Sequence, residues 1–423
     1  MPNTLYTNDN LFVLNGLNSN FVDLIYLDPP FNSKRIYSAP IGSKAAGSSF
    51  KDMWTWQDVN EAYLDTLAVK YPSLTRFIAT SGEIHSKAMM AYLTYMAQRI
   101  IEMHRILKDT GSLYLHCDSA ASHYLKIILD EIFGKNNFRN EIIWHYGARL
   151  MHNNKKINCK KDSIFFYAKS DKTLITPPVT EWTREQFIKT KRQAVHVNED
   201  GREFIWQDAG RGKPKAYKRY IDEVLEKGKA VDDVWAIPAL TSSDKERTSY
   251  PTQKPLALLH RIIKVSSNEG DMVLDPFCGC ATTCVAAQQL GRKWIGIDVE
   301  KQAVSILIER LSNDAGLFKD FVNTMIIPKR TDIEIEMPSI PVKERLYKEQ
   351  NGLCNACGTE FTIRNLEIDH IIPKAKGGSD HYENYQLLCS SCNKIKGDRP
   401  MEYLRLKINT REEMMKSKIV FGE

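Results

Sequence analysis

The four residues Asp28-Pro29-Pro30-Phe31 place an acid, two prolines and an aromatic ring at the end of an apolar run. The run, residues 22–27, predicts a buried strand that the prolines terminate. Because proline lacks an N–H group and has a fixed φ, the carbonyls of this turn project without internal partners. Such a turn can hold an exocyclic amino group while the aromatic ring stacks on the planar base that carries it. The alternative is an ordinary strand-exit turn, since Asp-Pro-Pro also occurs by chance.

A second acid-bearing turn follows the apolar segment 272–274. It reads Asp275-Pro276-Phe277-Cys278-Gly279, and another acid, Asp298, closes the next apolar segment. The glycine lets a ligand approach the backbone at the start of a helix, and the second acid can hold ribose hydroxyls. The turn lacks the three-glycine dinucleotide fingerprint, and its acid would repel a pyrophosphate. The pattern therefore favours a cationic ligand such as S-adenosylmethionine; the alternative is an α/β turn without a ligand.

Two Cys-x-x-Cys pairs stand near the C-terminal end, made of Cys354, Cys357, Cys389 and Cys392. Four thiolates in paired turns are typical of a closed tetrahedral zinc site. A module of about sixty residues with few large apolar groups needs such a metal to fold. We therefore expect a structural zinc at these four cysteines.

Apolar periodicity predicts the elements that position these motifs. One-faced patterns predict helices and apolar runs predict strands, which alternate along the chain. The helices are expected at 86–107, 255–265 and 281–290, and the strands at 112–117, 272–275 and 294–298. The alternation indicates an α/β domain with a mostly parallel sheet. Residues 32–60, a loop rich in Ser, Gly and Lys, are expected to form a lid over the substrate.

The composition limits the class of protein. With 423 residues, of which 43% are apolar, the chain can form two or three domains. No apolar run reaches membrane-spanning length, the first residues do not resemble an export signal, and the nine cysteines do not resemble a secreted disulfide framework. We therefore expect a soluble, cytoplasmic protein.

The positive charge is concentrated in one part of the chain. The net charge is +6, and residues 146–230 contain 19 Lys and Arg against 11 Asp and Glu. Within this block Trp182, Trp206 and Tyr217 are interleaved with the basic residues. Such a pattern predicts contacts with a nucleic acid, and the alternative is a well-solvated domain without a polyanionic partner.

The motifs together resemble the β-class amino-methyltransferases of DNA. Asp-Pro-Pro-Phe comes first, then the basic region, then Tyr-Pro-Thr-Gln-Lys-Pro at 250–255, and finally the two acids of the second turn. The resemblance implies a Rossmann-like S-adenosylmethionine-dependent methyltransferase sheet with helices on both faces, over residues 1–315. Within it, residues 170–232 would form a target-recognition region that reads double-stranded DNA.

The resemblance also implies roles for individual residues. Asp28 and the Pro29 carbonyl would accept hydrogen bonds from the target amine, and Phe31, after Pro30, would stack on the flipped base. The residues expected around the cofactor are Asp9, Lys254, Asp275, Phe277, Cys278, Gly279, Thr282 and Asp298. The aspartate indicates adenine N6 as the acceptor, with cytosine N4 as the alternative. The family often has a glycine where Ala281 stands, so we expect a negative φ at Ala281, a shifted turn and retained binding.

The C-terminal segment 343–400, after a linker at 316–342 and before a tail at 401–423, resembles the HNH nuclease family. This implies a small zinc-stapled ββα-metal domain. His370 would be the general base that activates water, and Asn384 would orient it. Asp369 and Asn393 would hold Mg²⁺ or a similar cation on the scissile phosphate.

These resemblances predict a single-chain restriction–modification enzyme, encoded by a prokaryote or a phage. It would methylate adenine in DNA and cut unmethylated sites, without a membrane partner; a homodimer is one assembly that the sequence allows. The alternative is a solitary DNA methylase whose zinc module only binds DNA.

Overall fold

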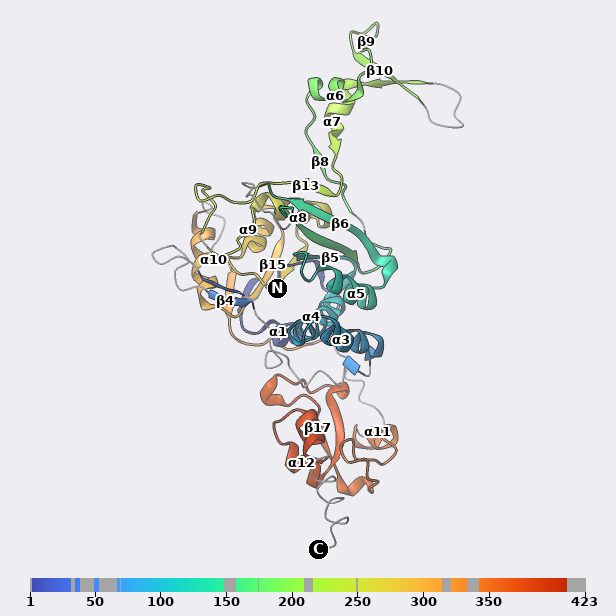
Figure 1. Cartoon of the computed structure of the whole chain (residues 1–423), viewed down its shortest axis with the longest axis vertical. Coiled ribbons are helices and arrows are strands. Elements are labelled where there is room, and N and C mark those ends of the chain that lie inside the picture. Colours follow the sequence, from blue (N-terminus) through green and yellow to red (C-terminus); the bar gives the residue numbers. More distant parts are fainter. Residues whose placement is uncertain are drawn as a thin grey trace.

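The central feature of the fold is a nine-stranded sheet within the described part of the chain (Figure 1). The computed structural model describes residues 2–31, 35–38, 49–52, 67–68, 70–147, 157–173, 175–208, 216–248, 250–313, 321–332 and 342–408. In spatial order the strands are β13 (Val234–Ala236), β6 (Phe138–His145), β7 (Lys161–Ala168), β5 (Leu107–Cys117), β2 (Val22–Leu27), β14 (Met272–Asp275), β15 (Lys293–Asp298), β1 (Asn3–Thr7) and β16 (Phe321–Thr324). β7 runs antiparallel to both of its neighbours, and the other pairs are parallel. The predicted mostly parallel sheet is confirmed.

Helices cover both faces of this sheet. The helices on one face are α1 (Asn10–Gly16), α3 (Pro72–Ile84), α4 (Lys87–Ile106) and α5 (Ser122–Phe133), and those on the other are α8 (Leu256–Ser266), α9 (Thr282–Gln289) and α10 (Lys301–Asn313). Because successive side chains of a strand point to opposite faces, Ile25 and Leu27 of β2 join the first core while Leu24 and Tyr26 join the second. This three-layer α/β arrangement is the fold class that the sequence predicts.

The three aspartates expected to act in methyl transfer or cofactor binding lie at the carboxyl ends of parallel strands. β1, β2, β14 and β15 are mutually parallel, so their carboxyl ends lie at the same edge of the sheet. Asp28 directly follows β2, while Asp275 and Asp298 are the last residues of β14 and β15. In parallel α/β sheets this edge is where ligands bind.

A small lobe with its own core lies at one end of the molecule (Figure 1). Its elements are β8 (Val179–Thr180), α6 (Arg184–Lys191), β9 (His196–Val197), β10 (Glu203–Gln207), β11 (Tyr217–Tyr220), α7 (Ile221–Lys227) and β12 (Lys229–Ala230). Phe187, Ile205, Ile221 and Val224 form its buried core. The lobe lies inside the region 170–232 that we expect to read DNA, and that assignment stays a prediction.

Part of the expected linker is built into the sheet domain. β16 pairs with β1 as an edge strand, and Asn8 Nδ2 donates to the Met325 carbonyl at 2.9 Å. Farther along, the Ser19 N–H donates to Asp332 at 2.7 Å. The sequence gives little sign of this, because a four-residue edge strand beside prolines has no periodicity to detect. Most of the expected lid, residues 32–60, lies outside the described residues. The described part of it contains two short strands, β3 (Arg35–Ser38) and β4 (Ser49–Asp52), which form an antiparallel pair.

The C-terminal domain lies at the opposite end of the molecule from the small lobe (Figure 1). It contains α11 (Val342–Glu349), the antiparallel strands β17 (Leu366–His370) and β18 (Tyr385–Cys389), and α12 (Ser390–Lys396). Short 3₁₀ turns are η4 (Ile363–Asn365), η5 (Lys374–Lys376) and η6 (Tyr382–Asn384), with η3 (Lys135–Asn137) in the sheet domain. The core of the C-terminal domain consists mainly of leucines and buried cysteines. Across the described residues, membrane-spanning helices are absent.

Candidate functional site

A cavity of about 590 Å³ opens at the carboxyl edge of the sheet. Every residue that the sequence assigns to methyl transfer or to its cofactor lines this cavity. These residues are Asp9, Asp28, Pro29, Pro30, Phe31, Lys254, Asp275, Phe277, Cys278, Gly279, Thr282 and Asp298. The structure therefore brings together turns that are about 250 residues apart in the chain.

The turn at Asp28 presents one carboxylate oxygen without a partner. Oδ2 of Asp28 accepts a hydrogen bond from Nζ of Lys254, and the side chain is 18% exposed. Oδ1 is buried and has no hydrogen-bond partner. A buried acceptor is costly to leave unpaired. An N–H donor bound in the cavity would satisfy this oxygen.

The ring of Phe31 packs against a buried polar network that the sequence did not predict. Its ring stacks on His116 with a centroid distance of 5.9 Å. Nδ1 of His116 lies 3.0 Å from the Tyr26 hydroxyl and Nε2 lies 3.1 Å from Asp162. Burial, with Asp28 nearby, raises the pKa of Tyr26 well above its usual value. The three polar residues come from β2, β5 and β7, so no local pattern could have linked them.

Two acids at the ends of neighbouring strands, Asp275 and Asp298, are held by backbone N–H groups. Asp275 is buried and accepts from the Phe277 N–H at 3.0 Å. Asp298 accepts from the Gly279 N–H and the Glu300 N–H, each at 2.8 Å. Burial raises the pKa of Asp275 to about 7, opposed by its hydrogen bond to Thr283, and burial also raises the pKa of Asp298. Asp275, which is buried, and Asp298, which is half-buried, both line the cavity and suit a ligand with positive charge.

The turn that follows Asp275 contains two residues with a left-handed backbone. Gly279 has φ +49°, and an added Cβ would lie 3.1 Å from the Tyr250 ring. Ala281, the N-cap of α9, has φ 57° and ψ 33°. The expected negative φ at Ala281 is therefore wrong. The alanine adopts the conformation that glycine would take, because its N–H must donate to the Cys278 carbonyl while its own carbonyl accepts from Val285 in α9.

Asp9 has structural partners as well as a place in the cavity wall. It is the N-cap of α1 and accepts from the Leu11 N–H at 2.8 Å. It also pairs with Arg99 at 3.1 Å. The buried Asn10 receives a hydrogen bond from Arg99 and donates to the Pro276 carbonyl at 2.7 Å, which joins α1 to the second turn. Sequence reasoning missed Asn10 and Arg99, since neither belongs to a motif.

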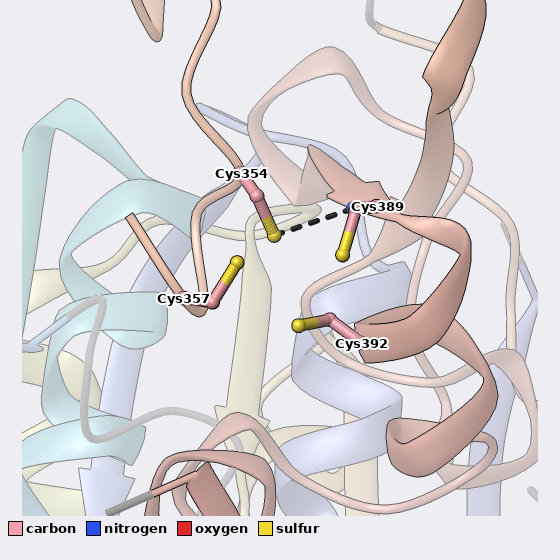
Figure 2. A group of neighbouring side chains, drawn as sticks. All are labelled: Cys354, Cys357, Cys389 and Cys392. Atoms are coloured by element: carbon pink, nitrogen blue, oxygen red, sulfur yellow. Dashed lines mark hydrogen bonds between the residues drawn. The ribbon is translucent and has the colours of Figure 1, made fainter. Parts of the chain in front are cut away.

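The four predicted zinc cysteines form one cluster (Figure 2). Their Sγ atoms all lie within 4.8 Å of one another. Cys354 and Cys357 belong to the turn after α11, while Cys389 and Cys392 come from the end of β18 and from α12. The Cys389 N–H donates to Sγ of Cys354 at 3.2 Å, as backbone groups do around a thiolate. The donor set of four thiols fits a tetrahedral zinc ion.

His370, the expected general base, has a different ring partner from the predicted one. Its Nε2 lies 2.8 Å from Asp380, which also pairs with Lys374 at 2.7 Å. Asn384 instead fixes the backbone after His370, accepting from the Ile372 N–H and donating to the Ser379 carbonyl at 2.8 Å. Asn384 therefore holds the loop that follows His370 and not the imidazole ring.

The two expected cation ligands bond separate partners. Asp369 accepts from Gln386 at 2.8 Å and pairs with the fully buried Lys396 at 3.0 Å. Asn393 donates to Glu367 at 2.6 Å. In this arrangement both oxygens of Asp369 have protein partners, and a lysine ammonium lies beside them. Glu367, Gln386 and Lys396 were missed by sequence reasoning.

Comparisons with known proteins cover both parts of the chain. Residues 22–309 match the DNA methylase family and residues 354–399 match HNH endonuclease. The type II methyltransferase M.EcaI of Enterobacter cloacae is 28% identical over 80% of this chain and 75% of its own length. The DNA adenine methyltransferase YhdJ of Escherichia coli is 25% identical over 73% and 82%. Among solved structures, PvuII DNA methyltransferase (cytosine-N4-specific) aligns with 77% of this chain and 96% of its own, at 15% identity and a TM-score of 0.44.

Proposed function

We propose that this chain, which belongs to the DNA methylase family and carries a C-terminal HNH domain, transfers a methyl group from S-adenosylmethionine to N6 of adenine in double-stranded DNA. The observation that carries the proposal is the unpartnered, buried Oδ1 of Asp28, in the same cavity as Asp275 and Asp298. Asp28 as the acid of the catalytic turn favours adenine, and a similar protein, YhdJ, is named an adenine methyltransferase.

The cavity residues fit this cofactor. S-adenosylmethionine supplies an electrophilic methyl group on a sulfonium, and it also has an amine and ribose hydroxyls. Asp275, which is buried, and Asp298, which is half-buried, offer carboxylates to the cavity, and Gly279 allows close approach of the ligand to the backbone. The charge of the ligand would lower the cost of ionising Asp275 and Asp298.

The catalytic turn acts on the amine. The lone pair of adenine N6 is delocalised into the ring, so the amine is a weak nucleophile. Oδ1 of Asp28 and the Pro29 carbonyl would each accept a hydrogen bond from N6, which favours a pyramidal nitrogen with its lone pair directed at the methyl carbon. The N–C bond would form as the sulfonium S–C bond breaks, which leaves a neutral thioether, and the proton that N6 loses would pass by way of Oδ1 of Asp28 to solvent. Orientation of this kind can contribute several kcal/mol.

The target base must leave the helix to reach this turn. Adenine stacked in a duplex cannot present its amine in line with a sulfonium, so the base is flipped. The ring of Phe31 stacks on His116, and we propose that the flipped base stacks on the ring of Phe31 in turn. Stacking there recovers part of the few kcal/mol lost on unstacking.

Asp28→Ala tests the proposal. The variant should abolish methyl transfer and keep DNA and cofactor affinities near those of the wild type, because the acceptor oxygen is lost while the other groups remain. The readouts are methyl transfer to a DNA substrate and binding by titration. Sequencing that detects modified bases then identifies the acceptor atom. Near-normal turnover in Asp28→Ala, or N4-methylcytosine as the product, would reject this form of the proposal.

For the HNH domain we propose DNA cleavage with His370 as general base. A carboxylate only accepts hydrogen bonds, so Nε2 carries the proton that bonds Asp380 and Nδ1 is left as the basic nitrogen. The expected Mg²⁺ ligands are not assembled in this geometry, because Lys396 and Gln386 hold Asp369 and Asn393 bonds Glu367. We therefore derive no step through the cation.

A plasmid-nicking assay with Mg²⁺, on methylated and unmethylated DNA, tests the nuclease and the restriction–modification role together. Cleavage of unmethylated DNA alone, lost in His370→Ala, is expected. The alternative, a methylase whose zinc module only binds DNA, is supported if neither substrate is cut.

A further inference from the structure

Lys254 is a buried lysine that contacts the catalytic turn. The residue is 8% exposed, and its Nζ donates to Oδ2 of Asp28. We propose that Lys254 is a positioning residue, which holds the Asp28 carboxylate so that Oδ1 remains available for the target amine. This inference rests on the proposed methyl transfer, and it assigns Lys254 a role toward Asp28 that differs from contact with the cofactor.

Because of this contact, the two carboxylate oxygens of Asp28 differ in their hydrogen bonding. Oδ2 is occupied by the ammonium, while Oδ1 is buried and unpartnered. Without a bond to one oxygen, the carboxylate could rotate and exchange the two positions. An acceptor fixed before the base arrives does not have to be ordered during the reaction.

The charges around the cavity explain why this lysine is needed. Among the described residues that line the cavity, Lys254 is the one basic side chain, against Asp9, Asp28, Asp275, Asp298 and Glu300. A cationic cofactor would attract every acid within reach. Arg99 already pairs with Asp9, and the ion pair with Lys254 neutralises Asp28, so that Asp275 and Asp298 remain for the cofactor and Asp28 remains for the amine.

The same ammonium contacts the stacking residue of the turn. Nζ of Lys254 lies 5.4 Å from the centroid of the Phe31 ring. This distance is within the range of a cation–π interaction. One buried charge therefore fixes both side chains of the turn that act on the base, the hydrogen-bonding Asp28 and the stacking Phe31.

The backbone on both sides of Lys254 is held by a set of buried and part-buried hydrogen bonds. Oε1 of Gln253 accepts from the Thr248 N–H at 2.8 Å and from the Thr248 hydroxyl at 2.9 Å. Nε2 of Gln253 donates to the Glu246 carbonyl at 2.8 Å, and the Glu246 carboxylate accepts from the N–H of Leu256, the first residue of α8, at 3.1 Å. The side chain of Gln253 thus anchors the segment so that the next residue, Lys254, points at Asp28.

Lys254→Met tests the proposal because methionine keeps much of the length and volume but removes the charge. The assay is single-turnover methyl transfer at saturating S-adenosylmethionine and DNA, with both affinities measured by titration. We expect the rate to fall about 100-fold, the scale that follows from a small misplacement of reacting groups. The two affinities should stay within about threefold, since the groups that bind both ligands remain. Lys254→Arg, which keeps the positive charge, should retain more of the rate than Lys254→Met.

Lys108→Met is the matched control. Lys108, in β5, pairs at 2.8 Å with Asp23 of β2, the strand that leads to Asp28, and Asp23 lies at the end of β2 away from the cavity. This variant removes a lysine–aspartate pair whose lysine side chain is 40% exposed, against 9% for Lys254, and it should leave the transfer rate unchanged. Equal losses in the two lysine variants would overturn the inference in favour of a general effect on β2. A full rate in Lys254→Met at saturation, with weakened cofactor binding, would overturn it in favour of a cofactor contact. Absence of transfer by the wild type would reject the proposed function itself, and this inference with it.

Discussion

Ala281→Gly isolates the energetic cost of the left-handed residue in the cofactor turn. Ala281 has φ 57° and ψ 33°, and its side chain is fully buried. The left-handed conformation costs alanine about 1–2 kcal/mol that glycine does not incur. Against this relief, glycine loses about 0.5–1 kcal/mol more in backbone entropy, and the buried methyl group contributes about 0.8 kcal/mol. The three effects nearly cancel, so the free energy of unfolding should change by no more than about 1 kcal/mol.

Ala286→Gly is the matched control, because Ala286 is fully buried in the interior of the same helix, α9, with a right-handed backbone. Here no strain is relieved, so the loss should be about 2 kcal/mol. Calorimetry of the full chain should show the melting temperature of the sheet domain falling by roughly 4 °C in Ala286→Gly and by less than about 2 °C in Ala281→Gly. The HNH domain, which carries neither substitution, is the internal reference. Equal destabilisation in the two variants would refute the left-handed strain at Ala281.

Two further predictions concern charge and metal. The pKa of Asp275 is raised to about 7 by burial, above its value in the unfolded chain, so the folded state loses stability as pH rises from about 4 to about 7 and no further above that. Asp275→Asn should therefore be more stable than the wild type, and the difference in the free energy of unfolding should grow over this pH range to at most about 4 kcal/mol. Urea titrations at pH 5 and pH 8 measure this difference. A difference that does not change with pH would contradict the raised pKa of Asp275. Removal of metal by a chelator should unfold the HNH domain and leave methyl transfer intact, because the small core there is built around the four cysteines. Calorimetry should then lose one transition that zinc restores, and a chelator with no effect on either transition would argue against a structural metal.

Local sequence determined the parts of the site that lie in single turns. An apolar run followed by an acid predicts a buried strand with a carboxylate at its end, and parallel strands bring such ends to one edge of a sheet. For this reason Asp28, Asp275 and Asp298 could be expected to share a cavity before any tertiary contact was known. The two Cys-x-x-Cys pairs could also be predicted from local sequence, because the two cysteines of each pair are only three residues apart.

The tertiary structure decided which residues become neighbours across the sheet. β5 lies between β2 and β7, and this order sets His116 between Tyr26 and Asp162. The segment before α8 packs against the turn after β2, which places Lys254 against Asp28. It also decided that Ala281 is left-handed, that residues 321–324 close one edge of the sheet, and that Asp380 bonds His370. Periodicity reports only which face of its own element a residue occupies. The partner of a polar side chain depends on strand order, register and rotamer, which are set by packing between segments that are distant in sequence.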